Sequence, residues 1–438
     1  MKVSPGKQKI KVVTLGCSKN VVDSEYLLRH IQVGGFTIVK EEDTLLPDIA
    51  IINTCGFIGD AKKESIDTFL HYVNLKKQGE VKKVYIMGCL SQRYKNELKE
   101  EVPELDGVFG INELGNILQE ISIDFKDELL GERFLTTPSH YAYLKISEGC
   151  DRKCSFCAIP LIKGKHLSRE KDEILKEARF LVSKGVKEIM LIAQDLTSYG
   201  RDLQGENTLT GLVEDLAGIP QLEWIRLHYA YPAKFPLELL DVIQQNPKVC
   251  KYLDIPFQHV SNRILKRMRR GYNQAHTMDL VNQIREKVPG IALRTTLLTG
   301  FPGESQDDHE ELIHFVKEVK FERLGVFAYS EEEDTYAWKN YKNDVPENIK
   351  EQRVDAIMKV QQEISREKNE EKIGSKLRVI IDQVNEDHAI GRTEFDSPEV
   401  DNEVIIHDFP TAMKPGDFVF VHVEGASEYE LHGKVVIV

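Results

Sequence analysis

The chain has 438 residues, of which 41% are hydrophobic and 29% charged, a composition typical of a globular protein with two or three domains. No apolar run approaches the ~18 residues of a membrane-spanning helix, and the first residues lack the apolar core of a secretory signal. We therefore expect a cytoplasmic protein without a membrane partner. The formal net charge of −13 argues against binding along a nucleic-acid backbone.

The first part of the chain alternates between short apolar runs and amphipathic helical patterns. The apolar runs lie at 10–15, 48–53 and 82–88, and segments such as VDSEYLLRHIQ and AKKESIDTFLHYV follow them. Continuous apolar strands that alternate with helices predict a parallel sheet with helices on both faces. We expect an α/β fold that begins with a flavodoxin-like domain over residues 8–125.

A second alternation begins near Tyr141 and contains six apolar runs, from YAYLKIS to RLGVFAYS. Six strand–helix units are too few for a complete eight-stranded barrel, so the pattern predicts a partial (β/α)6 barrel over 136–370. Its last part, from Val345 to about Lys372, has the pattern of a charged helical connector. The segment 373–438 then shows short strand patterns without a helix, which predict a small all-β barrel.

Three of the seven cysteines follow the first strand of the second unit with the spacing C-x3-C-x2-C: Cys150, Cys154 and Cys157. In a reducing cytoplasm cysteines are metal ligands, nucleophiles or core residues rather than disulfides. Three thiolates within eight residues suit a soft metal, and loops at the carboxyl ends of barrel strands are where such folds place active sites. A structural zinc site needs four ligands, and no fourth Cys or His lies close by; the alternatives are an incomplete zinc site or three unrelated thiols.

Three earlier cysteines, Cys17, Cys55 and Cys89, each come just after one of the three predicted amino-terminal strands. The carboxyl ends of parallel strands meet at one edge, where open α/β folds gather their binding groups. These thiols are candidates for a second metal site, and buried core cysteines are an equally open alternative. Cys250 matches neither group, and we expect it in the core.

The cysteine spacing in YLKISEGCDRKCSFC resembles the radical S-adenosylmethionine (SAM) superfamily. The strings LGCSKNVVDSE, NTCGFIGDAKKES, GCLSQRY and FAYSEEEDTYA, with a TRAM-like terminal barrel, resemble the methylthiotransferase family within that superfamily. This resemblance covers essentially the whole chain. It implies SAM and two [4Fe-4S] clusters as cofactors: a SAM-binding cluster on Cys150, Cys154 and Cys157, and an auxiliary cluster on Cys17, Cys55 and Cys89.

The resemblance also implies a mechanism. The SAM-binding cluster would reduce SAM to a deoxyadenosyl radical that abstracts a substrate hydrogen, and the auxiliary cluster would carry the sulfur delivered as a methylthio group. No flavin or nicotinamide fingerprint is visible, so an external electron donor is expected. The implied SAM contacts are Phe156, Gln194, Asp195, Gly300, Gly303 and Glu304. Gly and Pro after a strand are also ordinary turn residues, and a Phe beside a Cys is equally consistent with packing.

Family members modify either a tRNA adenosine or an aspartate of a ribosomal protein. AIPLIKGKHLSR and AQDLTSYG resemble the ribosomal-protein branch, whose target is the β-carbon of an aspartate in small-subunit ribosomal protein number twelve, free or within the ribosome. The segment 373–438 has five basic and thirteen acidic residues, a net charge of −8, which would repel phosphates and attract a basic protein. Binding of tRNA is therefore not expected, although the run KRMRR, more typical of an exposed helix face, could contact RNA.

Three other functions stay open on sequence alone. They are a tRNA adenosine methylthiotransferase, a non-catalytic iron–sulfur sensor or RNA-binding protein, and a zinc protein. A sensor would not cleave SAM, and a zinc protein would lack the about eight irons per chain that two clusters require.

Overall fold

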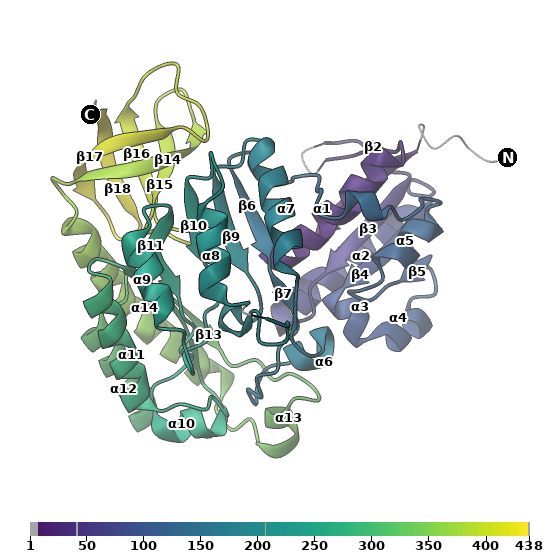
Figure 1. Cartoon of the computed structure of the whole chain (residues 1–438). Coiled ribbons are helices and arrows are strands. Elements are labelled where there is room, and N and C mark those ends of the chain that lie inside the picture. Colours follow the sequence, from purple (N-terminus) through teal and green to yellow (C-terminus); the bar gives the residue numbers. More distant parts are fainter. Residues whose placement is uncertain (1–7, 41–42, 206, 437–438) are drawn as a thin grey trace.

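The computed structural model describes residues 8–40, 43–205 and 207–436, so the last two residues of the predicted final strand lie outside the described part. Two parallel sheets lie side by side, and a small barrel stands at one end of the central sheet (Figure 1). The predicted fold class is confirmed: an α/β protein with an amino-terminal flavodoxin-like sheet, a six-stranded partial barrel and a terminal all-β barrel.

The amino-terminal sheet has the strand order β2-β1-β3-β4-β5, which is the flavodoxin-like order. The six residues of β3 are all buried because helices cover both faces, which is why this strand reads as a continuous apolar run. The strands are β1 Lys9–Thr14, β2 Thr37–Ile38, β3 Ile49–Thr54, β4 Lys83–Gly88 and β5 Gly107–Val108. The helices are α1 Ser18–Val33, α2 Gly59–Lys77, α3 Cys89–Arg93, α4 Lys95–Glu101 and α5 Leu114–Glu120, with the 3-10 turn Asp127–Leu129 after them.

The central sheet contains six parallel strands in the order β13-β12-β11-β10-β9-β6, as the six apolar runs predict. It is an open sheet, and one large apolar cluster fills the space between its strands and its helices. Its strands are β6 Tyr141–Lys145, β9 Glu188–Ile192, β10 Trp224–Leu227, β11 Val249–Asp254, β12 Ala292–Thr299 and β13 Arg323–Ala328, and a separate hairpin pairs β7 Ser147–Glu148 with β8 Leu167–Ser168. Cys250 lies in β11 and is 1% exposed, so its core assignment is confirmed.

The helices of the central domain pack along this sheet (Figure 1). They are α6 Ile159–Lys163, α7 Lys171–Ser183, α8 Leu209–Ala217, α9 Glu238–Gln245, α10 Asn262–Arg267, α11 Gln274–Lys287, α12 Gln306–Val319, α13 Tyr336–Asn340 and α14 Glu347–Glu370, with the 3-10 turn Leu196–Ser198. A capping box begins α12, since Ser305 and Asp308 each accept a hydrogen bond from the other's backbone N–H. The predicted connector helix is α14, which packs against α12 and β13 and leads into the terminal barrel.

The terminal barrel is closed, with the strand order β14-β15-β16-β18-β17. Its interior holds alternate apolar residues such as Val379, Val421 and Leu431, each at most 1% exposed. Alternate residues of a strand point to opposite faces, so one set fills the barrel interior. The strands are β14 Lys376–Val384, β15 Ala389–Thr393, β16 Glu403–Asp408, β17 Phe418–Ala426 and β18 Glu430–Val436.

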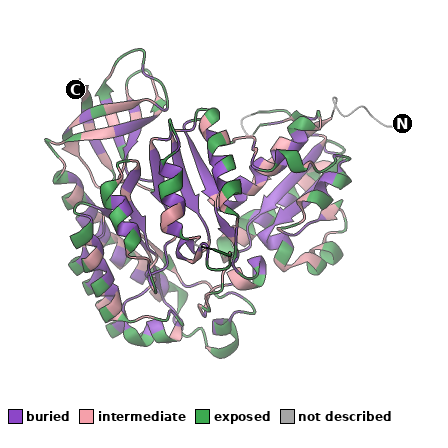
Figure 2. Ribbon diagram, viewed as in Figure 1, coloured by how far each residue is buried: buried purple, intermediate pink, exposed green. Residues whose placement is uncertain are grey.

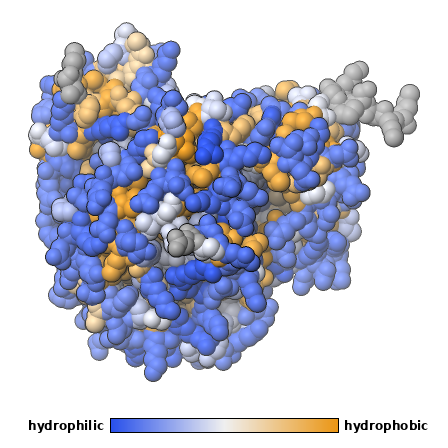
Figure 3. Space-filling model, viewed as in Figure 1, coloured by the Kyte–Doolittle hydropathy of each residue, from blue (hydrophilic) through white to orange (hydrophobic). Residues whose placement is uncertain are grey.

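Burial follows the layers: the strands of both parallel sheets are buried, and the outward faces of the helices are exposed (Figure 2). The face of the molecule in Figure 3 is mainly hydrophilic, with small apolar groups scattered across it. Within the described part of the chain, the helices are all too short or too polar to cross a bilayer.

Candidate functional site

The C-x3-C-x2-C segment forms the loop between β7 and α6, beyond the carboxyl end of β6. Gly149 has a φ of +77°, and a Cβ added there would lie 2.0 Å from the Lys165 carbonyl oxygen, so only glycine allows this approach. The Cys150 N–H donates to the Gly164 carbonyl at 3.1 Å, which closes the loop onto its own end. A cavity of about 310 Å³ lies against this loop, and Cys150 and Cys154 are among its lining residues.

Arg270 directs a guanidinium at the thiol of Cys154. Its Nη1 lies 3.2 Å from the Sγ atom, its Nη2 donates to the Pro256 carbonyl at 2.6 Å, and its residue is 5% exposed. The expectation that the KRMRR run forms an exposed helix face is therefore wrong for Arg270. The reason is local: α10 ends at Arg267, Arg269 takes a left-handed φ of 58°, and the chain turns Arg270 inward. An N–H group that donates to a thiolate sulfur tunes the electronic properties of the metal centre that the sulfur binds.

The three earlier cysteines lie where the sequence predicts, at the carboxyl ends of neighbouring strands β1, β3 and β4. Glycines let their loops touch. A Cβ added to Gly16, the residue before Cys17, would lie 2.8 Å from the Cys55 Sγ, and one added to Gly56 would lie 2.7 Å from the Leu90 backbone nitrogen next to Cys89. The amino-terminal triad is therefore assembled by backbone contact between three loops.

Asn20 joins the three loops by hydrogen bonds, and it is 1% exposed. Its Nδ2 donates to the carbonyl oxygens of Leu15, at 2.7 Å, and of Thr54, at 3.2 Å, while its Oδ1 lies 3.9 Å from the Cys89 Sγ. Asn53 supports it, because its Nδ2 donates to the Asn20 carbonyl at 2.9 Å. Sequence reasoning missed both asparagines; the only signal was their position within the strings that carry cysteines.

Both triads fit metal-bound thiolates. Burial raises the pKa of Cys150 to about 11 and that of Cys89 to about 12, and it also raises the pKa values of Cys55 and Cys157. Such thiols stay protonated near neutral pH unless a bound metal deprotonates them. In the described part of the chain no three Cys, His, Asp or Glu side chains converge tightly enough for a single metal ion. A polynuclear cluster, whose thiolate ligands stand at separate corners, suits this wider arrangement better than mononuclear zinc.

The two triads are connected through α3 and α6, which pack together (Figure 1). Cys89 opens α3 and packs with Ala158 and Ile162, directly after Cys157. Lys163, at the end of α6, lies 3.5 Å from a Glu148 oxygen, and its Nζ has no hydrogen-bond partner among the described residues. The short connection places both candidate clusters on one junction between the domains.

A buried carboxylate fixes the amino-terminal domain to the loop after β13. Glu332, 3% exposed, pairs with Arg93 at 2.6 Å and with Lys62 at 2.9 Å. Arg93 ends the helix that Cys89 opens, and it also donates to the Gly56 carbonyl at 3.4 Å. Glu332 therefore anchors the loops that carry two of the three early cysteines. Its string, FAYSEEEDTYA, gives no sign of which of three consecutive glutamates is buried.

The implied SAM contacts near the cysteine loop have different surroundings. Phe156 packs edge-to-face on Phe301, with ring centres 6.4 Å apart. The Gln194 Nε2 donates to Glu148, while its Oε1 is buried without a hydrogen-bond partner in the described part of the chain, as expected of an atom that a ligand donor would satisfy. Asp195 is already engaged: it accepts from Arg152 at 2.7 Å and caps the 3-10 turn that follows it.

The implied SAM contacts after β12, Gly300, Gly303 and Glu304, also contribute to packing. Gly300 has a φ of +73°, and a Cβ there would lie 2.3 Å from the Lys350 side chain in α14. Gly303 is left-handed as well, with a φ of +81°. Glu304 is 5% exposed and accepts from Arg353 at 3.0 Å, which ties the strand end to α14. These contacts explain the residues through packing, so their role toward SAM stays a prediction.

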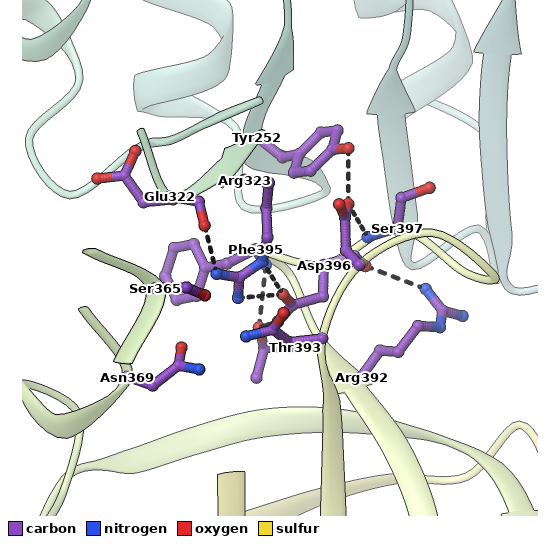
Figure 4. Close-up of polar contacts among 12 residues, drawn as sticks. Tyr252, Glu322, Arg323, Ser365, Asn369, Arg392, Thr393, Phe395, Asp396 and Ser397 are labelled. Atoms are coloured by element: carbon purple, nitrogen blue, oxygen red, sulfur yellow. Dashed lines mark hydrogen bonds and ion pairs between the residues drawn. The ribbon is translucent and has the colours of Figure 1, made fainter. Parts of the chain in front are cut away.

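The terminal barrel inserts its β15–β16 connection into the inner face of the central sheet (Figure 4). Asp396 accepts from Arg323 Nε at 2.8 Å and from the Thr393 hydroxyl at 2.5 Å. Arg323 is the first residue of β13, so this contact lies at the amino-terminal end of that strand, away from the cysteines. The Ser397 hydroxyl reaches further and lies 3.1 Å from the His228 Nε2, just beyond the carboxyl end of β10.

Many of the barrel's acidic side chains lie in its interface with the central domain and α14. Six of its thirteen acidic side chains form hydrogen bonds with residues of the central domain or α14: Asp382, Glu394, Asp396, Glu399, Asp401 and Glu428. Asp396 and Asp401 are fully enclosed by basic and hydroxyl partners. Net charge counted along the sequence therefore overstates what the barrel presents to a partner.

Comparisons with known proteins cover all three domains. Family descriptions match residues 9–110 (Uncharacterized protein family UPF0004), 144–316 (Radical SAM superfamily) and 373–436 (TRAM domain). Proteins named "Ribosomal protein uS12 methylthiotransferase RimO" are similar over nearly the whole chain. The one from Bacteroides thetaiotaomicron is 50% identical over 430 residues, 98% of this chain and 99% of its own, and the one from Cytophaga hutchinsonii is 49% identical over 430 residues, 98% of each chain.

Solved structures are similar in fold at low identity. The radical SAM methyltransferase TsrM from Kitasatospora setae superposes with a TM-score of 0.55 at 14% identity over 73% of each chain. The cobalamin-dependent radical enzyme OxsB superposes with a TM-score of 0.52 at 13% identity, over 79% of this chain and 56% of its own. At these identities the likeness concerns the fold alone.

Proposed function

The chain belongs to the radical SAM methylthiotransferase family that acts on ribosomal protein uS12, and from this premise we propose which of its residues perform the reaction. The observation that carries the function is the 50% identity to such enzymes over 98% of the chain. The enzyme transfers a methylthio group to the β-carbon of an aspartate in uS12. Its cofactors are SAM and [4Fe-4S] clusters, which when bound supply the radical and the sulfur.

We propose that Cys150, Cys154 and Cys157 hold the SAM-binding cluster and that Cys17, Cys55 and Cys89 hold the auxiliary cluster. Support comes from the loops that glycine contacts close around each triad and from the burial that raises the thiol pKa values. The amino-terminal domain (8–125), the radical SAM domain (136–370) and the barrel (373–438) divide this work between them.

Other residues position these ligands and SAM. Arg270 donates toward Cys154, and Asp195 holds Arg152 beside Cys150. The unpaired Gln194 Oε1 is the polar atom best placed for the methionyl part of SAM, and Phe156 borders the adenosine side together with the segment 300–304. Because Asp195 is saturated with donors, we assign it to orientation rather than to direct contact.

The partner is the basic ribosomal protein, free or within the ribosome, and the reductant is an external electron donor. The barrel's remaining acidic side chains, such as Glu386 and Glu403, leave a negative outer surface that favours a Lys/Arg-rich protein over tRNA. This support is weaker than the net charge of −8 suggests, because six acidic groups face the central domain. We place the reaction in the cytoplasm, where ribosomes and reduced thiols are found.

The decisive experiment is anaerobic reconstitution followed by mass spectrometry of two candidate substrates. The expected product is methylthio-aspartate in uS12, with deoxyadenosine released and about eight irons bound per chain. Methylthio-adenosine in tRNA would reassign the substrate. Bound iron without deoxyadenosine would indicate a non-catalytic iron–sulfur protein, and stoichiometric zinc with little iron would exclude both clusters.

A further inference from the structure

Lys19 is a nearly buried cation at the junction of the two sheets. It lies in the first turn of α1, two residues after Cys17, and is 7% exposed. Its Nζ lies 3.2 Å from the centre of the Tyr229 ring, which follows β10 of the central domain. No Asp or Glu within the described residues forms an ion pair with it.

Most of the buried Lys and Arg side chains that the structure describes pair with an Asp or Glu. Arg226 is buried beside Glu188 at 2.8 Å, and Lys145 pairs with both Asp23 and Glu148. Desolvating an ammonium costs more free energy than contact with an aromatic face returns. The contact between Lys19 and its tyrosine is therefore insufficient compensation, and an anion that enters the site would complete it.

The surroundings of Lys19 favour an anion over a cation. No acidic residue occupies the first turn of α1, whose amino-terminal end carries partial positive charge. His228 directly precedes Tyr229, and its pKa is held well below its usual value by burial first and then by Arg226, Arg294 and Lys19. Arg226 and Arg294 are themselves paired with Glu188 and Asp254, so among these cations Lys19 alone has no ion pair with an Asp or Glu of the described residues.

Lys19 lies between the loop of Cys17 and the carboxyl end of the central sheet. Cys17 precedes it on one side, and Tyr229 stands beyond the carboxyl end of β10 on the other. Val22, one turn further along α1, packs into the apolar cluster that includes Tyr143 and Ile192 of the central sheet. The helix is thus fixed across the domain junction, and its first turn has a defined position.

We propose that the Lys19 ammonium binds the side-chain carboxylate of the substrate aspartate. The inference rests on the proposed function and adds the group that recognises the target residue. In an aspartate the β-carbon is bonded directly to the carboxylate carbon, so an ion pair to the carboxylate fixes the reacting carbon one bond away. Lysine suits this task because its ammonium is a compact point charge. An asparagine or an adenine would leave the buried cation without its counter-ion.

The test is a double-mutant cycle across the complex, measured as binding. The reconstituted enzyme, kept anaerobic, is titrated with a fluorescent uS12 peptide that carries the target aspartate and with the same peptide carrying asparagine. The variants are Lys19→Met, which keeps the length and removes the charge, and the matched control Lys63→Met, an exposed lysine of α2. Removing one partner of a buried charge pair weakens binding by about thirtyfold or more.

The expected result is a preference for the aspartate peptide in the unmodified enzyme and in Lys63→Met that disappears in Lys19→Met. Equal preference in all three proteins would overturn the proposal. If Lys19→Met fails to retain iron, Lys19→Arg decides: a displaced charge should keep the aspartate preference and lower kcat for methylthio transfer, whereas unchanged kcat would also overturn it. Failure of the unmodified enzyme to modify aspartate at all would instead reject the proposed function, independently of these binding results.

Discussion

Glu332→Gln tests whether one buried carboxylate holds the auxiliary-cluster loops against the central domain. The substitution keeps the volume of the side chain and removes a charge that faces Arg93 at 2.6 Å and Lys62 at 2.9 Å. Removal of one partner from a buried ion pair costs about 3–5 kcal/mol. Arg93 keeps carbonyl acceptors at Gly56 and Glu333, and Lys62 is 19% exposed and can rehydrate, so we expect the lower end, about 3 kcal/mol.

The assay is amide hydrogen exchange of the reconstituted enzyme, followed in α3 and the adjoining loop after Cys55. A loss of about 3 kcal/mol in local opening free energy accelerates exchange there by about 100-fold. Glu331→Gln is the matched control, because that neighbouring glutamate is exposed. The reasoning is refuted if the two variants exchange at the same rate in α3, or if the acceleration in Glu332→Gln is spread evenly over the chain.

Three further outcomes follow from the structure. Asp396→Asn leaves Arg323 buried without a counter-ion, and we expect the free energy of unfolding of the central domain and barrel to fall by about 3–5 kcal/mol, seen as a lower urea midpoint. Arg270→Gln removes a cationic donor from Cys154, so the midpoint potential of the SAM-binding cluster should become more negative in a redox titration followed by electron paramagnetic resonance. Burial lowers the pKa of His259 to about 3, so below about pH 6.5 the unfolded chain binds a proton at this residue that the folded chain does not bind. The contribution of His259 to stability is therefore complete above pH 6.5, and about 2 kcal/mol of it is lost by pH 5. Denaturation of His259→Gln at both pH values should lack this loss.

Each of these predictions has an exposed counterpart that isolates the cause. Glu403→Gln removes a barrel carboxylate that is exposed and should leave the urea midpoint unchanged. Arg269→Gln removes the neighbouring exposed arginine and should shift the cluster potential less than the buried one does. His314→Gln, with a side chain 81% exposed, should keep the pH slope of the unmodified protein. An equal effect from a control and its buried partner would contradict the corresponding explanation.

The parts of the fold that the sequence predicted are those with a local pattern of apolar and polar residues. Strand β3 is apolar at nearly every position because both faces are covered, and barrel strands β16 and β17 alternate in burial because one face is covered. The cysteine loop after β6 could be predicted as a metal-binding loop because its three cysteines lie within eight residues. The proximity of the three early cysteines could be predicted only from the expected sheet topology, because neighbouring strands bring cysteines that are distant in sequence to one edge.

What sequence could not supply is which member of a similar group is buried. KRMRR has several basic residues, but only the left-handed turn at Arg269 determines that Arg270 faces Cys154. Glu331, Glu332 and Glu333 are chemically alike, and docking of the amino-terminal domain selects the middle one. Which of these residues is buried depends on contacts between segments distant in sequence, and such contacts produce no local pattern in the sequence.

The position of the barrel explains why its charge cannot select the reacting residue. Its docking contacts begin at the amino-terminal ends of the central strands, and a strand of five or six residues spans about 17–20 Å before the cysteine loops begin. Only the tip of its β15–β16 connection reaches the carboxyl end of a central strand, where Ser397 contacts His228 after β10. The outer barrel surface can therefore attract a basic protein but contacts it far from the target aspartate. Recognition of the aspartate itself must come from groups at the carboxyl ends of the strands. Two buried cations there, Lys19 and Arg270, form no ion pair with an Asp or Glu of the described residues, and Arg270 is already engaged by the Cys154 thiol and the Pro256 carbonyl, whereas Lys19 contacts only the Tyr229 ring.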